Sequence, residues 1–123
     1  MNPKKVLIKI FNQFIRERDK DKPCISCGIR PSQDAGHYWP TSTHPQPAMR
    51  FNEQNVHGQC RSCNRFKEGN RQGYREGLIK RYGEKILLDL DIKRSVNQNP
   101  WGQFEYLTMI HHYKQKVKAL TLL

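Results

Sequence analysis

Four cysteines, arranged in two pairs, have the most specific spacing of any chemically active side chains in this 123-residue sequence. Cys24 and Cys27 form one pair and Cys60 and Cys63 the other, each with two residues between the thiols. Two thiolates at this spacing bind one ion from a single tight turn, and Gly28 after the first pair allows the chain to reverse. The second pair lies where a helical pattern begins, and the amides at a helix start stabilise thiolate charge. The sequence therefore predicts a structural zinc ion held by all four cysteines.

The segment between the cysteine pairs contains side chains suited to catalysis. His37 ends the tetrapeptide Asp-Ala-Gly-His, Asn55 lies five residues before the third cysteine, and Asn64 directly follows the fourth. In this arrangement the chain resembles the HNH, or ββα-metal, nucleases, which place a histidine on a first strand, an asparagine before the third zinc cysteine and a His or Asn after the fourth. The resemblance implies a metal-dependent endonuclease with His37, Asn55 and Asn64 as its catalytic residues.

A more specific resemblance covers most of the chain after residue 23. It rests on the segments CISCG, DAGHY, NVHGQCRSCN, YREGLIKRYG and HHYKQKVKAL. These are similar to the NinG (Rap) recombination proteins of lambdoid phages. For that family the resemblance implies a metal-dependent endonuclease that acts on branched DNA recombination intermediates, such as D-loops and Holliday junctions, in the bacterial host cell.

The residue types fit this chemistry. Hydrolysis of a phosphodiester requires a base that activates water, a divalent cation that stabilises charge on the phosphate, and cationic groups that hold the backbone. His37 suits the base, because a neutral imidazole accepts a proton near pH 7. Asn55 is expected to orient this base or to brace the hairpin. Asn64 offers a hard oxygen to Mg²⁺, and Lys67 lies within reach of a neighbouring phosphate.

The second ligand of the catalytic cation has several candidates. Many HNH nucleases carry an acidic ligand directly before the base, where this chain has Gly36. Asp34 is the nearest carboxylate, but three residues from His37 it lies on the opposite strand face unless the backbone turns. His57 or His44 are alternatives, and a histidine-rich site favours Mn²⁺ over Mg²⁺.

The charge of the chain indicates a polyanionic partner. Lys and Arg number 22 against 11 Asp and Glu, a formal net charge of +11, which favours nucleic acid, with solubility alone as the alternative. Basic residues gather in the helix that carries the fourth cysteine and in the segment after it. We expect them to contact the phosphate backbone of DNA without recognising its base sequence. They are Arg61, Arg65, Lys67, Arg71, Arg75, Lys80 and Arg81. We therefore expect branched or duplex DNA as partner and no small-molecule substrate.

Cellular location follows from what the sequence lacks. No stretch approaches the length of apolar residues that a membrane span needs, and the first residues contain no cleavage site, so we expect a cytoplasmic protein without membrane association. The redox poise of the cytoplasm disfavours disulfides, which favours metal ligation for the cysteines.

Hydrophobic periodicity predicts helices on both sides of the cysteine-rich segment, in an α+β fold. A cysteine turn, a hairpin and a helix with the second cysteine pair describe a small treble-clef zinc unit, and the resemblance implies that it is of the HNH-like ββα-metal type. We expect an amphipathic helix and linker over residues 1–22, the zinc unit over 23–70 and a basic helical extension over 71–123. Strands are expected near 34–39 and 50–55. Helical patterns cover 3–18, 61–70, 74–82, 84–96 and 101–123.

Only 36% of residues are hydrophobic, so the core is lean and support from a metal or a second subunit is expected. The apolar surface of the last two helical segments predicts either a homodimer or a C-terminal helix that folds back on the chain's own core. The alternatives to a junction-specific nuclease are a non-catalytic DNA- or RNA-binding zinc module, an HNH nuclease without structure preference, and a protein-interaction module.

Overall fold

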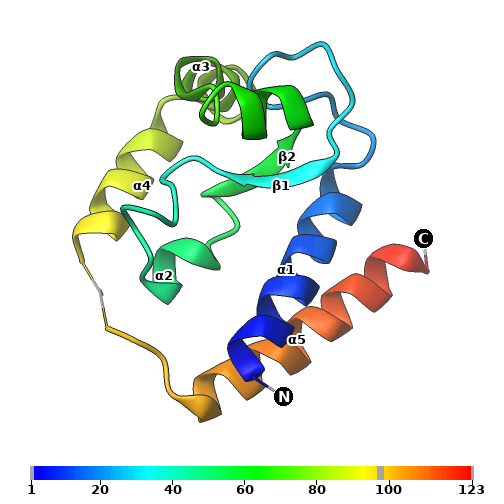
Figure 1. Ribbon diagram of the computed structural model, residues 1–123, viewed down its shortest axis with the longest axis vertical. Helices are drawn as coiled ribbons and strands as arrows, with labels where there is room; N and C mark the ends of the chain where they lie inside the picture. Colours follow the sequence, from blue (N-terminus) through cyan, green and yellow to red (C-terminus); the bar gives the residue numbers. More distant parts are fainter. Residues whose placement is uncertain (1, 97–98, 123) are drawn as a thin grey trace.

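The computed structural model describes residues 2–96 and 99–122. Within those ranges, helices surround a two-stranded antiparallel sheet (Figure 1), which confirms the expected small domain of mixed α and β structure. In chain order the elements are α1 (Pro3–Asp19), β1 (Asp34–His37), α2 (Pro47–Arg50), β2 (Val56–Gln59), the π-helical turn η1 (Ser62–Phe66), α3 (Arg71–Tyr82), α4 (Lys85–Ser95) and α5 (Gln103–Thr121).

Helix α1 forms where the sequence has its first amphipathic stripe. The side chain of Asn2 accepts a hydrogen bond from the backbone N–H of Lys4 at 2.9 Å, and Pro3 is tolerated in the first helical turn. The buried face packs against α5, which lies beside it in Figure 1. The side chains of this first core are Leu7, Phe11, Phe14, Ile15, Phe51, Val56, Ile110 and Tyr113. Each large apolar side chain removed from water in this way contributes about 1.5–3 kcal/mol.

The second strand of the hairpin lies later in the chain than the sequence predicts. The expected strand at 50–55 is wrong, because Pro47 begins the short helix α2 and the following residues form turns. In those turns the backbone N–H of Gln54 donates to the Asn52 side chain at 2.8 Å, and that of Asn55 donates to the Asn52 carbonyl at 2.9 Å. Asparagine side chains that bond their own backbone favour turns over strands.

The expected helix over 61–70 is also shorter than predicted. It ends at Phe66, because the chain turns left-handed at Glu68 and Asn70, where φ is 50° and 41°. The helices predicted over 74–82, 84–96 and 101–123 are present as α3, α4 and α5, with bounds shifted by a few residues.

A second core lies on the other side of the sheet. It joins the loop after the first cysteine to α2, α3 and α4 through Ile25, Tyr38, Met49, Tyr74, Leu78, Ile86 and Leu90. Figure 1 shows the sheet between α3 and α1. The hairpin is therefore supported from both sides, which two four-residue strands need because an isolated hairpin of this length is marginal in water.

The C-terminal helix folds back on the chain itself. Ile110 and Tyr113 of α5 belong to the first core, so part of its apolar surface is covered within one chain. Phe104, Leu107 and Leu122 remain exposed, and the homodimer stays a prediction. None of the helices in the described ranges has the length and apolar character to cross a membrane.

A buried carboxylate connects the end of α1 to the sheet. Asp19 is fully buried and accepts hydrogen bonds from the Arg18 guanidinium at 2.8 and 2.9 Å and from the Gly58 backbone N–H at 2.9 Å. Arg18 also donates to the Val56 carbonyl at 2.8 Å. Burial alone would raise the pKa of Asp19, but the hydrogen bond and charge of Arg18 outweigh it and lower the pKa.

We expect Asp19→Ala to lower the free energy of unfolding by about 3 kcal/mol, because it leaves Arg18 and an N–H of β2 without their partner. Urea unfolding at pH 7 measures the change, with the exposed Asp21→Ala as control. The pKa of Asp19 is lower in the folded chain than its ordinary value of 3.8. Its contribution to the free energy of unfolding is therefore complete above pH 3.8 and is lost as the pH falls through the pKa of the folded state. The difference between wild type and Asp19→Ala should therefore shrink in acid, and a difference that grows there would contradict this role.

Candidate metal centre and adjoining pocket

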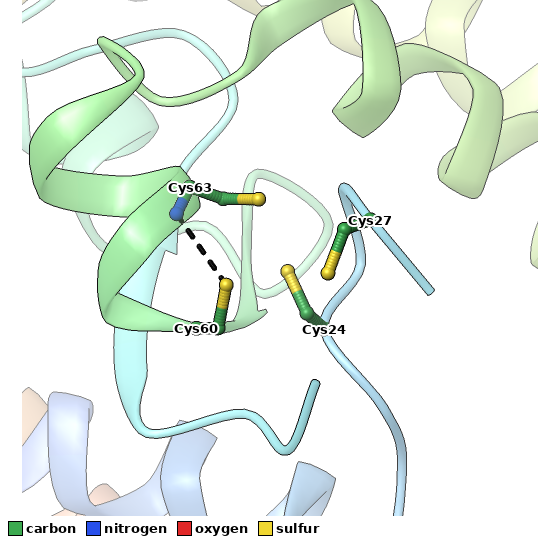
Figure 2. A group of neighbouring side chains, drawn as sticks. All are labelled: Cys24, Cys27, Cys60 and Cys63. Carbon is green, nitrogen blue, oxygen red and sulfur yellow. Dashed lines mark hydrogen bonds between the residues drawn. The ribbon is translucent and has the colours of Figure 1, made fainter. Parts of the chain in front are cut away.

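The four cysteines gather in one place. The Sγ atoms of Cys24, Cys27, Cys60 and Cys63 all lie within 4.8 Å of one another, and Figure 2 shows them converging from the loop after α1 and from the start of η1. Four sulfurs at about 2.3 Å from a tetrahedral zinc are about 3.8 Å apart, so the cluster has the size that such an ion needs. The cluster can hold a metal such as zinc, as the spacing predicts.

Both cysteine pairs are held by tight turns that direct N–H groups at sulfur. Gly28, with φ at 69°, closes the first turn by donating its N–H to the Cys24 carbonyl at 2.9 Å. In the second pair the N–H of Cys63 points at Cys60 Sγ at 3.4 Å (Figure 2). The side chain of Asn70 donates to Cys63 Sγ at 3.3 Å. Such donors stabilise thiolates, the form in which cysteine binds a metal.

Burial and hydrogen bonds shift the pKa values of the thiols in different directions. Burial raises the pKa of Cys24, and it raises that of Cys63 to about 12. Burial also acts to raise the pKa of Cys27, but hydrogen bonds from the Arg30 and Ile29 backbone lower it to about 6. Four thiolates this close require a cation, and a divalent ion among them deprotonates coordinating thiols.

A surface pocket of about 210 Å³ adjoins the cluster and brings His37 and Asn64 together. Its lining is completed by Tyr38, Pro40, Thr41, Glu68, Gly69 and Arg71. His37 ends β1, and its Nε2 lies 3.0 Å from the Arg50 carbonyl. Burial lowers the pKa of His37 below its ordinary 6.5, so the imidazole is neutral at pH 7. The base and the hard ligand expected from the sequence therefore line one cavity.

Asn64 is oriented by Asp34. The Asn64 Nδ2 donates to Asp34 Oδ2 at 3.0 Å, and because a carboxylate only accepts, the amide oxygen must face away from it. Asp34 also accepts from Arg65 at 3.1 Å and pairs with Arg61 at 3.6 Å. Asp34 does not line the pocket, so the structure places this candidate ligand behind Asn64 rather than beside His37.

Asn55 braces the loop that faces His37. It is fully buried, accepts from the Trp39 N–H at 2.8 Å, and donates to the Trp39 and Met49 carbonyls at 3.1 Å. In the described part of the chain it makes no hydrogen bond with the His37 imidazole, and it does not line the pocket. It holds in place Met49, whose neighbour Arg50 bonds the imidazole, so it fits the bracing role of the two expected from the sequence.

His57 lies apart from the other candidates. It is buried, its Nδ1 lies 3.1 Å from the Tyr74 hydroxyl, and it lines a different pocket together with Arg18 and Tyr82. Burial, reinforced by the charge of Arg18, lowers the pKa of His57 to about 3. The structure does not bring it together with His37 and Asn64.

The basic residues expected to contact phosphate fall into distinct environments. Arg71 lines the pocket, with its guanidinium 4.2 Å from the Trp39 ring centroid and 4.9 Å from that of Tyr38. Arg81 donates to the Pro23 carbonyl at the base of the first cysteine turn. Arg61 and Arg65 bond Asp34, as described above. Lys67, Arg75 and Lys80 are exposed.

Comparison with known proteins identifies the family. The family model described as Bacteriophage Lambda NinG protein matches residues 3–122. The chain belongs to the NinG family. It is 45% identical over 111 residues to Protein ninG of Escherichia phage lambda, 44% to that of Escherichia phage 933W and 45% to that of Salmonella phage P22.

These alignments cover 89% of the chain and 52–53% of the relatives, so the chain spans about half the length of the curated relatives it matches. No solved structure matches the chain. The resemblance to NinG seen in the sequence motifs is thus confirmed.

Sequence reasoning missed the acidic side chain of this pocket. Glu68 lines it from the turn between η1 and α3. Its φ of 50°, like the 41° of Asn70, lies in the left-handed region, which costs a residue other than glycine of order 1–3 kcal/mol. The dipeptide Gly69-Asn70 is the signal that could have indicated a turn here in place of a continued helix.

We expect the purified chain to contain one zinc ion, and its removal by a strong chelator to unfold the segment between the cysteine pairs, because metal binding of this kind contributes folding free energy of order 10 kcal/mol. Elemental analysis and thermal melting by circular dichroism measure both. Cys60→Ser should behave like the chelated protein, whereas Ser62→Ala, between two ligands, should melt like wild type. A chain without metal whose melting ignores the chelator would refute the zinc centre.

Proposed function

We propose that this chain is a metal-dependent DNA endonuclease of the HNH type that hydrolyses phosphodiester bonds in branched recombination intermediates, such as D-loops and Holliday junctions. The observation that carries the proposal is the shared pocket of His37 and Asn64 beside the four-cysteine cluster. Those two side chains come from β1 and η1, and their meeting in one cavity is what a hydrolytic site of this type requires.

His37 acts as the general base in this proposal. Its Nε2 faces the Arg50 carbonyl at 3.0 Å, and since a carbonyl only accepts, Nε2 carries the proton of the neutral ring. Nδ1 therefore holds the free electron pair and takes a proton from the attacking water. The lowered pKa of His37, which burial causes, keeps this nitrogen unprotonated at neutral pH.

In this proposal Asn64 binds the catalytic cation and Arg71 binds the scissile phosphate. With its Nδ2 bound to Asp34, the Asn64 amide turns its oxygen toward other partners, and oxygen donors suit Mg²⁺ or Mn²⁺. A divalent cation bound there supplies charge stabilisation at the scissile phosphate. Arg71, held over Trp39 and Tyr38, presents a guanidinium at the same pocket and is suited to bind a phosphate oxygen.

The exposed basic residues of α3 and of the segment before it support binding to duplex DNA. Arg75 and Lys80 are exposed on α3, and Lys67 is exposed just before it. Contacts of this kind follow the phosphate backbone and carry no base information. A substrate recognised by its branched geometry fits such a surface, and the membership in the NinG family supports a phage DNA substrate.

The decisive experiment is cleavage of a labelled four-way junction, a D-loop and plain duplex in Mg²⁺, Mn²⁺ or EDTA. We expect cutting of the branched substrates that requires the cation and that falls about 10²- to 10⁴-fold in His37→Ala, because the general base is lost. His111→Ala, an exposed histidine of α5, is the matched control and should cut like wild type.

Cleavage unaffected by His37→Ala would remove the proposed base. DNA bound tightly but cut under none of these conditions would instead establish the alternative, a zinc-stabilised binding module. Equal cutting of junction and plain duplex would leave an HNH nuclease without structure preference.

A further inference from the structure

The pocket contains a carboxylate that no other group neutralises. Glu68 lines it with His37 and Asn64, and within the described residues its side chain has no hydrogen bond or ion pair. By contrast, Asp34 is bound by two arginines and Asn64, and Glu53 by Lys116 and Tyr113. In the described part of the chain, Glu68 is thus a carboxylate without an ion pair in the same pocket as the Arg71 guanidinium.

A free carboxylate at this place also opposes phosphate binding. Arg71 in the same pocket attracts a phosphate group, and an ionised Glu68 repels it. A divalent cation held by the carboxylate would make the two compatible, because its charge would offset that of Glu68 and attract the phosphate.

Packing disfavours an acidic ligand at the position directly before the base, because the buried Gln59 side chain would have to move. A Cβ on Gly36 would clash with the Gln59 side chain, which lies against the strand at that point. Asp34 is the other nearby carboxylate of β1, and it is occupied by Asn64, Arg61 and Arg65. Glu68, by contrast, lines the pocket from the loop after η1.

The loop that carries Glu68 is held in a fixed position. The Gln59 side chain that covers Gly36 donates its Nε2 to the Gly69 carbonyl at 2.7 Å. On the other side of Gly69, Asn70 donates to Cys63 Sγ at 3.3 Å. Glu68 is thus placed relative to Asn64 by β2 and by the cysteine cluster, and its left-handed backbone is maintained by these contacts.

We propose that Glu68 is the carboxylate ligand of a divalent cation that it binds together with the Asn64 amide oxygen. The inference rests on the proposed function. The donor set consists of hard oxygens beside an imidazole, which fits Mg²⁺ or Mn²⁺.

The test is Mn²⁺ binding to the zinc-loaded chain without DNA, followed by electron paramagnetic resonance and calorimetry. Glu68→Gln keeps size and removes charge, and it should weaken Mn²⁺ binding at least about tenfold and raise the Mg²⁺ concentration for half-maximal cleavage by a similar factor. Glu76→Gln, an exposed carboxylate of α3, is the matched control and should bind Mn²⁺ like wild type. Zinc content and melting temperature should be the same in all three proteins.

Mn²⁺ binding that is equal in Glu68→Gln and wild type would overturn the assignment of Glu68, whether or not the wild type cuts DNA. If wild-type chain binds Mn²⁺ through Glu68 but cuts no DNA, the cation site stands and the proposed nuclease does not. If wild type binds no Mn²⁺ and cuts nothing, both fail.

Discussion

The convergence of four thiols on one point is the constraint on which the remaining structure depends. Two strands of four residues and a single π-helical turn bury too little apolar surface to hold one another. The cysteine cluster joins the loop after α1 to the start of η1, so residues 36 apart in sequence, Cys24 and Cys60, lie within 4.8 Å at their sulfurs. Because Asn64 follows Cys63 directly, fixing that cysteine also fixes the pocket wall opposite His37.

Buried polar groups then determine the backbone around the pocket. The Tyr74 hydroxyl donates to the Gly36 carbonyl of β1 at 2.8 Å and contacts His57 of β2. Helix α3 therefore contacts both strands through this one hydroxyl. Asn55 closes the loop between Trp39 and Met49 with three hydrogen bonds. Each of these groups is costly to bury without its partner, which penalises alternative arrangements of the hairpin. The backbone around the pocket is thus held by side chains that are themselves buried.

Much of this architecture is predictable from local sequence, and the remainder depends on contacts between distant residues. The helices follow from apolar periodicity, and the metal cluster from cysteine spacing, because both are encoded within a few residues. The second strand was misplaced because β2 carries little alternation of its own: all four of its residues are buried, between two cores that the sequence does not display. His37 and Asn64 were found through their resemblance to a motif. Glu68 was not, because its place in the pocket depends on a left-handed turn and on a hydrogen bond from Gln59.

Gln59 connects the absence of a carboxylate on the strand before His37 to the presence of one on the loop after η1. Its side chain occupies the space above Gly36, so an acidic residue directly before His37 would require that side chain to move. The same amide bonds the Gly69 carbonyl and holds the loop in which Glu68 faces the pocket. A carboxylate on this exposed loop stays in contact with water, whereas one at the buried position of Gly36 would lose that contact. Asp34, still on the strand, pairs with two arginines and serves to orient Asn64. The carboxylate that faces the pocket and the one that orients Asn64 therefore lie on different elements, one on the loop after η1 and one on β1.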